Sequence, residues 1–318
     1  MKNYFFGIDG GGTRSRIAII NRAGETFAHC EAGSTNIYSV SEAMVFENLA
    51  ALLNGALQQA GIERDALAGG CIGSAGLSRQ RELALFRGWF DMLLGAHVPV
   101  KLCTDGEILL YGGLDGPEGY CLIAGTGSLA LARSRDGTLT RAGGFGYLLG
   151  DEGAAAWIGK SAIARSLRSE ELRDLPTRMT AALLSACTLS NSSDLIRYVH
   201  HDANKAEIAA LAPLVTAAAR NNDALALDIL QNSATELALL VRSLIARTPH
   251  ITNRTLVLAG GVIEHDEIVH QHLTVLLAAE CPDIAPITPR RNALEGACLL
   301  AMSTTTPDLA PITSTTQA

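Results

Sequence analysis

The first residues of the chain that could do chemistry lie in the stretch GIDGGGT, which begins at residue 7. Asp9 supplies a carboxylate and Thr13 supplies a hydroxyl. Between them lie Gly10, Gly11 and Gly12. Glycine adopts positive φ readily and has no Cβ, so backbone N–H groups in such a stretch can approach an anion such as phosphate. The alternative is a tight hairpin turn that binds nothing.

The residues that follow exclude two familiar phosphate loops. A P-loop requires Lys and then Ser or Thr after its glycines, and neither pair follows Gly12. A dinucleotide-binding loop requires a helix at that point. The stretch RSRIAII, residues 14–20, instead begins with period-2 alternation and is rich in β-branched residues, which indicates a strand. We therefore predict a hairpin of strand, glycine turn and strand.

The same pattern returns after residue 115. Residues 118–143, EGYCLIAGTGSLALARSRDGTLTRAG, again predict three strands, and the first turn holds Thr126 and Gly127. A third glycine element, Gly260 and Gly261, follows the strand TLVLA. We interpret the two hairpins as a weak internal duplication. They could hold a polyphosphate from two sides, and the third element could lie against a nucleoside.

Three further carboxylates stand at places that suit chemistry. Asp105 ends a strand in HVPVKLCTDGE, where open α/β sheets bind ligands, and it could accept a proton from a hydroxyl. Asp151 and Glu152 lie between glycines, and such acceptors suit a polyol. An ammonium group on a substrate would also require a carboxylate, which either of these two could supply. The alternative for all three is the capping of the helix that follows.

Strands and helices alternate in the order that would position these residues. The first part predicts about three strands over residues 4–31, a helix between Ser41 as N-cap and Gly61 as stop, a strand in 68–77 and an amphipathic helix in 79–95. After the second hairpin come a helical region over 153–247, a strand and helix from 255, a short strand at 285–289 and a last helix at 291–302. This alternation predicts an α/β fold. We expect two domains, 1–115 and 116–290.

Bulk properties exclude several classes of protein. Hydrophobic residues make up 48% of the 318, and the net charge of −7 argues against a nucleic-acid surface. No run of 18 apolar residues predicts a membrane span, and Asp9 interrupts the apolar start, so we expect no signal peptide. The seven scattered cysteines indicate free, buried thiols in a reducing cytoplasm. The tail 304–318 is rich in Thr, Ser and Pro, which is typical of disorder.

Taken in order, the motifs resemble the actin-like ATPase fold, and within it the BadF/BadG-type ATPases and N-acetylglucosamine kinases. The resemblance covers residues 6–301. GIDGGGT is similar to the first phosphate motif of that family, IAGTGS to the second and LAGGV to the adenosine motif. GSTN, TDG, GGFGYLLGDEG and NALEGA are similar to the segments around the sugar.

The resemblance implies two actin-like (ribonuclease H-like) ATPase domains around a central cleft, with the helix at about 291–303 folded back on the first. It implies phosphorylation of the 6-hydroxyl of N-acetylglucosamine by ATP, with glucosamine and then N-acetylmuramic acid as alternatives. We expect a cytoplasmic enzyme that binds no nucleic acid and no membrane, and possible homodimers.

The expected roles of the residues follow from the same resemblance and from their chemistry. Asp9 would hold Mg²⁺ through water, and Asp105 would be the general base. The expected ATP contacts are Gly10, Gly11, Gly12, Thr13, Thr126, Gly127, Ser128, Gly260 and Gly261. The expected sugar contacts are Asn36, Asp105, Ser128, Gly143, Gly144, Asp151 and Glu152, and Ser74, Ala75 and Gly76 are expected to line the same cleft.

Three alternatives use the same fold. ATPase activators of acyl-CoA dehydratases or reductases require cysteines for an iron–sulfur cluster, and the segment SLALARSRDG after Gly127 has none. Regulators or glucokinases of the ROK type carry a helix-turn-helix or a Cys-rich zinc segment, and neither is visible. A protein that binds ATP without turnover is disfavoured by Asp9, Asp105, Thr13 and Thr126 but stays open.

Overall fold

The computed structural model describes residues 2–305 apart from residues 75 and 115, with side chains as far as residue 303. The predicted tail therefore lies almost wholly outside the described residues, and so does Ala75. Contacts between residues divide the chain into two compact units. The first holds the residues up to Pro117 together with those from Pro289 onward, and the second runs from Glu118 to Thr288.

The first unit is built on a five-stranded mixed sheet of order β3-β2-β1-β4-β5. Its strands are β1 (Tyr4–Gly10), β2 (Arg14–Asn21), β3 (Thr26–Gly33), β4 (Leu67–Ser74) and β5 (Val100–Cys103). The first three strands pair antiparallel, whereas β1, β4 and β5 run parallel. The predicted hairpin and the three strands over residues 4–31 are confirmed.

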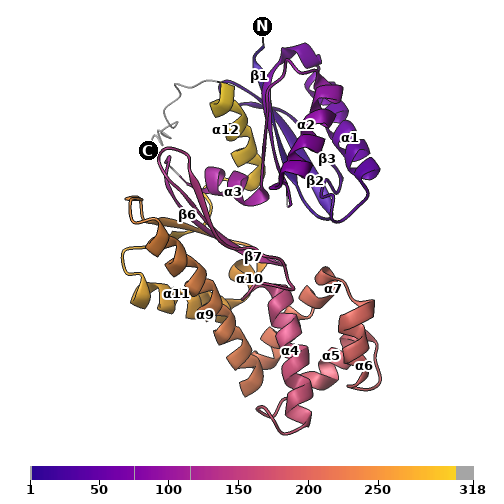
Figure 1. Cartoon of the computed structure of the whole chain (residues 1–318), viewed down its shortest axis with the longest axis vertical. Helices are drawn as coiled ribbons and strands as arrows, with labels where there is room; N and C mark the ends of the chain where they lie inside the picture. The colour runs from indigo at the N-terminus through magenta and orange to yellow at the C-terminus, as the bar shows by residue number, and fades with distance from the viewer. Residues whose placement is uncertain (1, 75, 115, 306–318) are drawn as a thin grey trace. The chain divides into compact units, whose positions relative to one another are not determined.

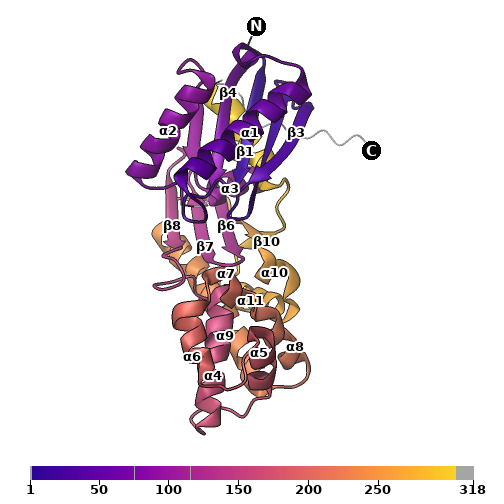
Figure 2. The same ribbon diagram turned by 90° about the vertical axis from the view of Figure 1, so that its right-hand side faces the viewer.

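Helices cover both faces of this sheet. As Figure 1 and Figure 2 show, α1 (Glu42–Ala60) and α2 (Gln80–Leu94) lie on one face, and α3 (Asp105–Gly113) and α12 (Ala293–Thr305) lie on the other. A short 3-10 turn, Arg64–Ala66, precedes β4. Helix α1 begins and ends as predicted, because the Ser41 side chain accepts a hydrogen bond from the N–H of Met44 and Gly61 takes the left-handed conformation.

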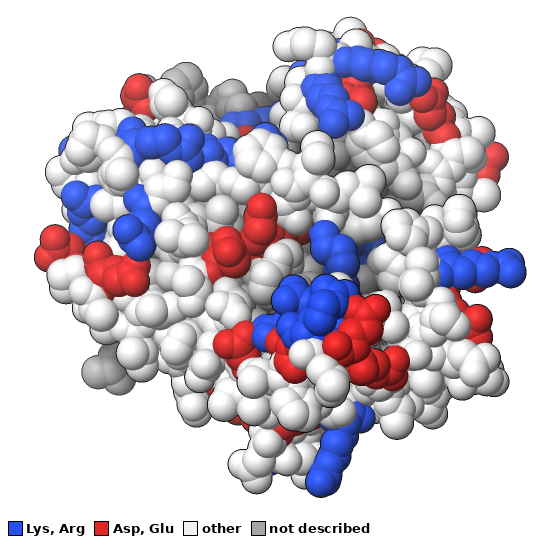
Figure 3. Space-filling view, turned by 60° about the horizontal axis from the view of Figure 1, so that its bottom comes forward, with Lys and Arg blue, Asp and Glu red and all other residues white. Residues whose placement is uncertain are grey.

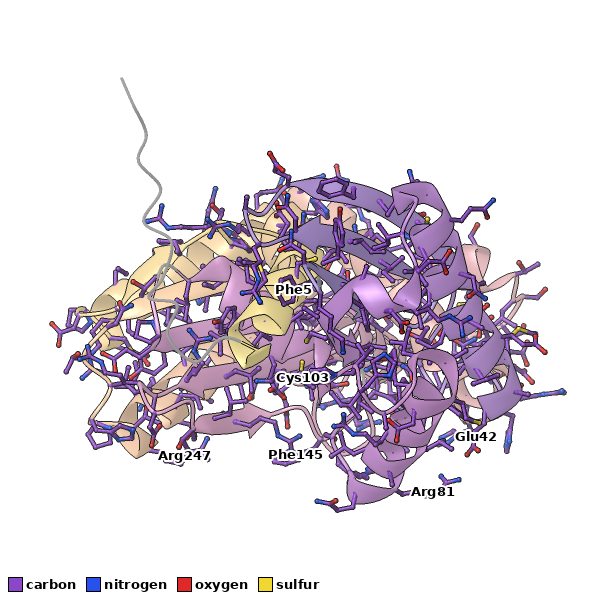
Figure 4. All side chains as sticks on the ribbon, turned by 90° about the horizontal axis from the view of Figure 1, so that it is seen from above. Phe5, Glu42, Arg81, Cys103, Phe145 and Arg247 are labelled. Atoms are coloured by element: carbon purple, nitrogen blue, oxygen red, sulfur yellow. The ribbon has the colours of Figure 1, made fainter. Side chains whose placement is uncertain are left out.

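Two glycines let α12 lie directly against α3. A Cβ on Gly296 would stand 1.9 Å from the carbonyl oxygen of Ile108, and a Cβ on Gly112 would stand 2.8 Å from the carbonyl oxygen of Asn292. The same face of the sheet contributes Phe5 and Cys103 to this core, and Figure 4 labels both beside α12. The close contact fixes α3, the helix that begins at Asp105.

The second unit repeats the topology of the first. Its sheet has the order β10-β9-β6-β7-β8, with strands β6 (Gly119–Ala124), β7 (Ser128–Arg133), β8 (Leu139–Gly143), β9 (Thr255–Ala259) and β10 (Ala285–Ile287). Strands β6, β7 and β8 pair antiparallel, and β6, β9 and β10 run parallel. The internal duplication predicted from the two glycine hairpins is therefore confirmed, as is the α/β class.

Between β8 and β9 the chain is helical, as predicted. The helices of this unit are α4 (Ala155–Glu170), α5 (Met179–Cys187), α6 (Asp194–Arg197), α7 (Lys205–Ala209), α8 (Ala212–Arg220), α9 (Ala224–Arg247), α10 (Gly261–His265) and α11 (Glu267–Glu280), with a π-helical turn at Tyr198–Asp202. They enclose a single large core around α9, which lies beside α11 (Figure 1).

Helix α9 is long and apolar enough, by length and composition alone, to cross a membrane. Half of its most apolar 18-residue window is buried within the protein, and ten of its residues, Leu237 and Val241 among them, are buried. We therefore interpret α9 as a core helix. All seven cysteines are free, as predicted, although Cys30 and Cys187 are only half-buried.

Candidate functional site

The first hairpin turns tightly between β1 and β2. The N–H of Gly11 donates to the carbonyl oxygen of Arg14 at 3.1 Å. None of Gly10, Gly11 and Gly12 has positive φ, so the expectation that these glycines are needed for φ is wrong. Gly10 and Gly11 are needed for space: a Cβ would stand 2.5 Å from Thr35 Oγ1 at Gly10 and 2.5 Å from the Arg14 carbonyl at Gly11. Gly12 and Thr13 are exposed at the tip.

The GSTN segment, residues 33–36, is hydrogen-bonded to this hairpin. Ser34 Oγ donates to the carbonyl oxygen of Gly11 at 2.9 Å, and the hydroxyls of Ser15 and Thr35 lie 2.8 Å apart. Asn36 follows in the same segment, and its side-chain oxygen accepts from the N–H of Tyr38 at 2.9 Å. The structure thus brings Asn36 next to Gly12 in the predicted phosphate turn.

Asp9 lies at the end of β1 and is not free. Its carboxylate accepts from Arg16 Nη2 at 2.6 Å, across the hairpin register that pairs these two residues. The Asp9 side chain is 17% exposed, so the carboxylate can still be reached. Among the described residues, no cluster of three His, Cys, Asp or Glu could form an all-protein metal site. A single carboxylate fits Mg²⁺ bound mainly by water and phosphate oxygens.

The carboxyl ends of the parallel strands meet at one edge of the first sheet. Gly10 pairs with Ser74, and Gly73 pairs with Cys103. Asp105 follows two residues after β5 and is exposed at this edge. The predicted ligand-binding end of the sheet thus carries Asp105 and the first hairpin together.

Asp105 is not the cap of α3, so that alternative is wrong. Thr104 is the N-cap: its hydroxyl accepts from the N–H of Glu107 at 3.3 Å, and the Glu107 carboxylate accepts from the Thr104 N–H at 3.2 Å. This capping box satisfies the helix start. One oxygen of Asp105 accepts from the N–H of Gly106 at 3.0 Å.

Ser74 and Gly76 also lie near the first hairpin. Ser74 Oγ would stand 2.8 Å from a Cβ on Gly10, and Gly76, with φ of +85°, lies against the ring of Tyr38. Both residues line a small hollow together with Thr35. Ala75 lies outside the described residues.

In the second unit, the tip of the β6–β7 hairpin is anchored on the start of α4. The carbonyl oxygens of Gly125 and Thr126 accept from the N–H groups of Ala155 and Ala156 at 2.9 and 3.2 Å. Thr126 itself is exposed. Hydrogen bonds from the first turn of α4 to these carbonyl oxygens therefore hold the hairpin turn in place. The side chain of Thr126 is left accessible.

The third glycine element lies beside this hairpin. Gly260 has φ of +100°, and a Cβ there would stand 2.5 Å from the carbonyl oxygen of Ala124. A Cβ on Gly125 would stand 3.9 Å from the backbone nitrogen of Gly261. Two of the predicted ATP motifs, far apart in sequence, thus touch each other in the second unit.

Asp151 lies against the β6–β7 hairpin, where it forms a close ion pair with Lys205. Its Oδ2 accepts from Lys205 Nζ at 2.7 Å, and its side chain is 5% exposed. A Cβ on Gly127 would stand 2.6 Å from that oxygen and 2.8 Å from Nζ. A side chain at residue 127 would displace this ion pair, so glycine is favoured there independently of any phosphate.

Neither Asp151 nor Glu152 caps α4, whose N-cap is Ala154 without a side-chain bond, so that alternative is wrong. Asp151 has φ of +58°, a costly conformation for a non-glycine residue. Ser128 Oγ donates to the carbonyl oxygen of Glu152 at 2.7 Å, so its proton is already engaged. Burial, and then the charge of Glu152, raise the pKa of Glu236.

Gly143 and Gly144 lie at the end of β8, where this strand pairs with β7. Both have positive φ, +71° and +72°, which favours glycine at both positions. Gly143 pairs with Leu129, the residue after Ser128. The loop that follows reaches Asp151 in eight residues.

Two charged residues of the site were missed from sequence. Arg16 could have been found, because the predicted hairpin register places it opposite Asp9. Lys205 could not, because it comes from a helical segment without a motif and lies 54 residues from Asp151.

The chain is similar along nearly its whole length to proteins that are named as amino-sugar kinases. The chain is 31% identical to an N-acetylmuramic acid/N-acetylglucosamine kinase of Clostridium acetobutylicum, over 94% of this chain and 98% of that one. It is 27% identical to an N-acetyl-D-glucosamine kinase of Dictyostelium discoideum, over 95% and 98%. A solved structure named as a candidate N-acetylglucosamine kinase, from Chromobacterium violaceum, matches with a TM-score of 0.74 and 28% identity, over 94% and 98%.

The family model for the BadF/BadG/BcrA/BcrD ATPases matches residues 6–301. This range contains both hairpins, the third glycine element and all of the candidate carboxylates. The prediction of two actin-like domains is confirmed by the repeated sheet topology and by this structural neighbour. The chain belongs to the BadF/BadG/BcrA/BcrD ATPase family.

Proposed function

We propose that this protein is an ATP-dependent amino-sugar kinase, with the 6-hydroxyl of N-acetylglucosamine as the phosphate acceptor. The observation that carries the proposal is the match along nearly the whole chain to relatives that are themselves amino-sugar kinases. The site residues support it, because each unit gathers its own share of the predicted phosphate and sugar contacts.

Asp105 is the general base in this proposal. Its carboxylate takes the proton of the sugar 6-hydroxyl as that oxygen attacks the γ-phosphorus of ATP; the bond from this phosphorus to the β–γ bridging oxygen breaks, and ADP leaves. Thr104 and Glu107 complete the cap of α3, so the Asp105 side chain is not part of that cap. An exposed carboxylate at the end of a parallel strand is well placed for such a role.

The glycine turns serve the nucleotide. Backbone N–H groups around Gly12 and Thr13 in one hairpin, and around Thr126 in the other, would donate to phosphate oxygens. The exposed Gly261, which lies beside Gly125, would face the nucleoside. Asp9 would hold Mg²⁺, whose charge offsets that of the phosphates during transfer. Arg16 orients the Asp9 carboxylate through their 2.6 Å contact.

The sugar would be bound by Asn36, Ser128, Gly143, Gly144, Asp151 and Glu152, with Asp105 at its reacting hydroxyl. N-acetylglucosamine is our first choice because two matching proteins are named for it. N-acetylmuramic acid is supported by the name of the Clostridium acetobutylicum relative. Glucosamine is the remaining alternative and differs from the first choice by its ammonium group.

We further propose that the enzyme works in the cytoplasm, where ATP and a reducing environment suit seven free thiols. Small molecules are its expected ligands. Figure 3 shows acidic and basic side chains intermixed on the face in view, without a continuous basic stripe there. The net charge of −7 agrees with a protein that does not bind nucleic acid. A homodimer is compatible with this proposal but is not required by it.

A coupled ADP-release assay with Mg-ATP tests the proposal. The panel is N-acetylglucosamine, glucosamine, N-acetylmuramic acid, N-acetylmannosamine, glucose and a control without sugar. We expect strong stimulation by N-acetylglucosamine and a product phosphorylated at the 6-hydroxyl. Equal ADP release in every tube would contradict the kinase assignment and would indicate an ATPase that acts on a partner protein.

A further inference from the structure

Lys205 brings a positive charge into the predicted sugar site, and no motif assigns a role to it. Its Nζ lies 2.7 Å from Asp151 Oδ2, and both atoms lie over the backbone of Gly127. The Asp151 side chain is 5% exposed and that of Lys205 is 35% exposed. The pair therefore stands at the second hairpin, with the carboxylate inside and the ammonium group nearer to solvent.

The ion pair is not needed to hold α7 in place. Asn204 and Glu207 form a capping box at the start of that helix. Ile208 is buried, and its carbonyl oxygen would stand 2.1 Å from a Cβ on Gly159 of α4, so the two helices are in direct contact. Since caps and packing already fix α7, the charge of Lys205 is free to serve the site.

The charge of Lys205 acts on the carboxylate that the sugar would meet. The attraction between a carboxylate and an ammonium group on a substrate is strongest when no other cation is paired with that carboxylate. A neutral sugar needs only an oxygen that accepts a hydrogen bond. Lys205 offsets the charge of Asp151 through Oδ2, the oxygen that its Nζ contacts. The neighbouring Glu152 lies close enough to Glu236 to raise the pKa of that group.

We propose that Lys205 is a specificity-determining, positioning residue: by pairing with Asp151 it selects neutral N-acetylated sugars over the ammonium sugar glucosamine. This inference rests on the proposed kinase function and on the contact of Asp151 with the sugar.

The test is the ratio of kcat/KM for glucosamine to kcat/KM for N-acetylglucosamine. We expect Lys205→Met to raise this ratio by about tenfold or more, the size of one charge contact at a partly solvated site. Lys205→Arg should keep the wild-type ratio, because it keeps the charge. Arg242→Met is the matched control, since it removes a cation from an exposed pair with Glu280 in the same unit. Lys205→Gln repeats the measurement if the Met variant does not fold.

Several results would overturn the inference. An unchanged ratio in the Met and Gln variants, with both sugars losing activity equally, would mean that Lys205 only stabilises the fold. A ratio that moves with Glu152→Gln but not with Lys205→Met would assign the discrimination to Glu152. A wild-type protein that phosphorylates none of the sugars would refute the proposed function, and this inference with it. An active wild type with an unmoved ratio would refute the inference alone.

Discussion

Replacing Asp105 by Asn should separate catalysis from stability, because the expected losses of rate and of stability differ greatly in size. The substitution removes the charge and the proton-accepting oxygen but keeps the size of the side chain. The cap of α3 stays intact, since it is made by Thr104 and Glu107. The helix loses one acidic group from its first turn, a charge worth about 0.3–1 kcal/mol of stability.

The expected loss of catalysis is larger. A general base contributes about 10²–10⁴ in rate, which corresponds to about 2.7–5.4 kcal/mol of transition-state stabilisation. We therefore expect Asp105→Asn to lower kcat by about 100-fold or more in the ADP-release assay, by the same reasoning. The thermal unfolding midpoint should change little, and the variant should still bind the sugar in calorimetry.

Glu42 offers the matched control. It is also the first residue of a helix in the same unit, with a separate N-cap, and it pairs at the surface with Arg81, as Figure 4 shows. Glu42→Gln removes the same charge from the same helix position away from the proposed site, so kcat should stay near that of the wild type. An Asp105→Asn variant with near-wild-type kcat would refute the base assignment, whatever its stability.

Four other perturbations give independent checks. Asp9→Asn should raise the Mg²⁺ concentration needed for half-maximal turnover, and an unchanged titration would remove Asp9 from the metal site. Gly296→Val should destabilise the first unit by at least about 1–3 kcal/mol in urea unfolding, because a side chain there overlaps the backbone of α3. The Arg165 guanidinium holds the pKa of the buried Asp174 carboxyl well below its usual range. The stabilisation of the folded state by this ion pair is therefore present above pH ~4 and is lost as the pH falls. Asp174→Asn should flatten that acid limb of the stability curve, and a curve of unchanged shape would contradict the assignment. Gly261→Ala should weaken ATP binding in calorimetry while leaving stability equal or higher, since Ala favours the helix start; unchanged affinity would mean that no ligand approaches this residue.

The parts of the fold that could be predicted are those fixed by local sequence. A hairpin needs only a turn and two alternating strands, so both hairpins and the repeat between them were visible in the glycine pattern. The start of α1 at Ser41 and its end at Gly61 follow from caps within one turn of the helix. The alternative in which Asp105 caps α3 missed the cap by one residue, because Thr104 and Asp105 are both good caps and only the Glu107 partner decides between them.

The parts of the site that could not be predicted depend on long-range contacts. The ion pair of Asp151 with Lys205 spans 54 residues and a helical region without motifs. The strained backbone at Asp151 likewise has no local sequence signal. Such features arise from tertiary packing, which strand and helix periodicity do not encode.

The glycines of the three motifs divide into two groups once the structure is known. Gly10, Gly127 and Gly260 have no room for a Cβ, since one would stand at most 2.6 Å from another protein atom. Their identity is explained by the protein itself and says nothing about a ligand. Gly125 and Gly261 are different: neither has positive φ, and a Cβ on either would stand 3.8 Å or more from the nearest protein atom outside its chain neighbours.

The fold therefore gives no reason for glycine at Gly125 and Gly261, which lie beside each other at the second hairpin. Gly12 at the first hairpin is less open, since a Cβ there would stand 3.2 Å from Ser39 Oγ, but that atom is the end of an exposed side chain that can move. One such glycine stands in each of the three motifs. Close approach by a bound molecule is the remaining physical reason for a missing side chain at an exposed turn. These three positions, rather than the glycine-rich stretches as a whole, are the strongest support for nucleotide binding that the motifs contain.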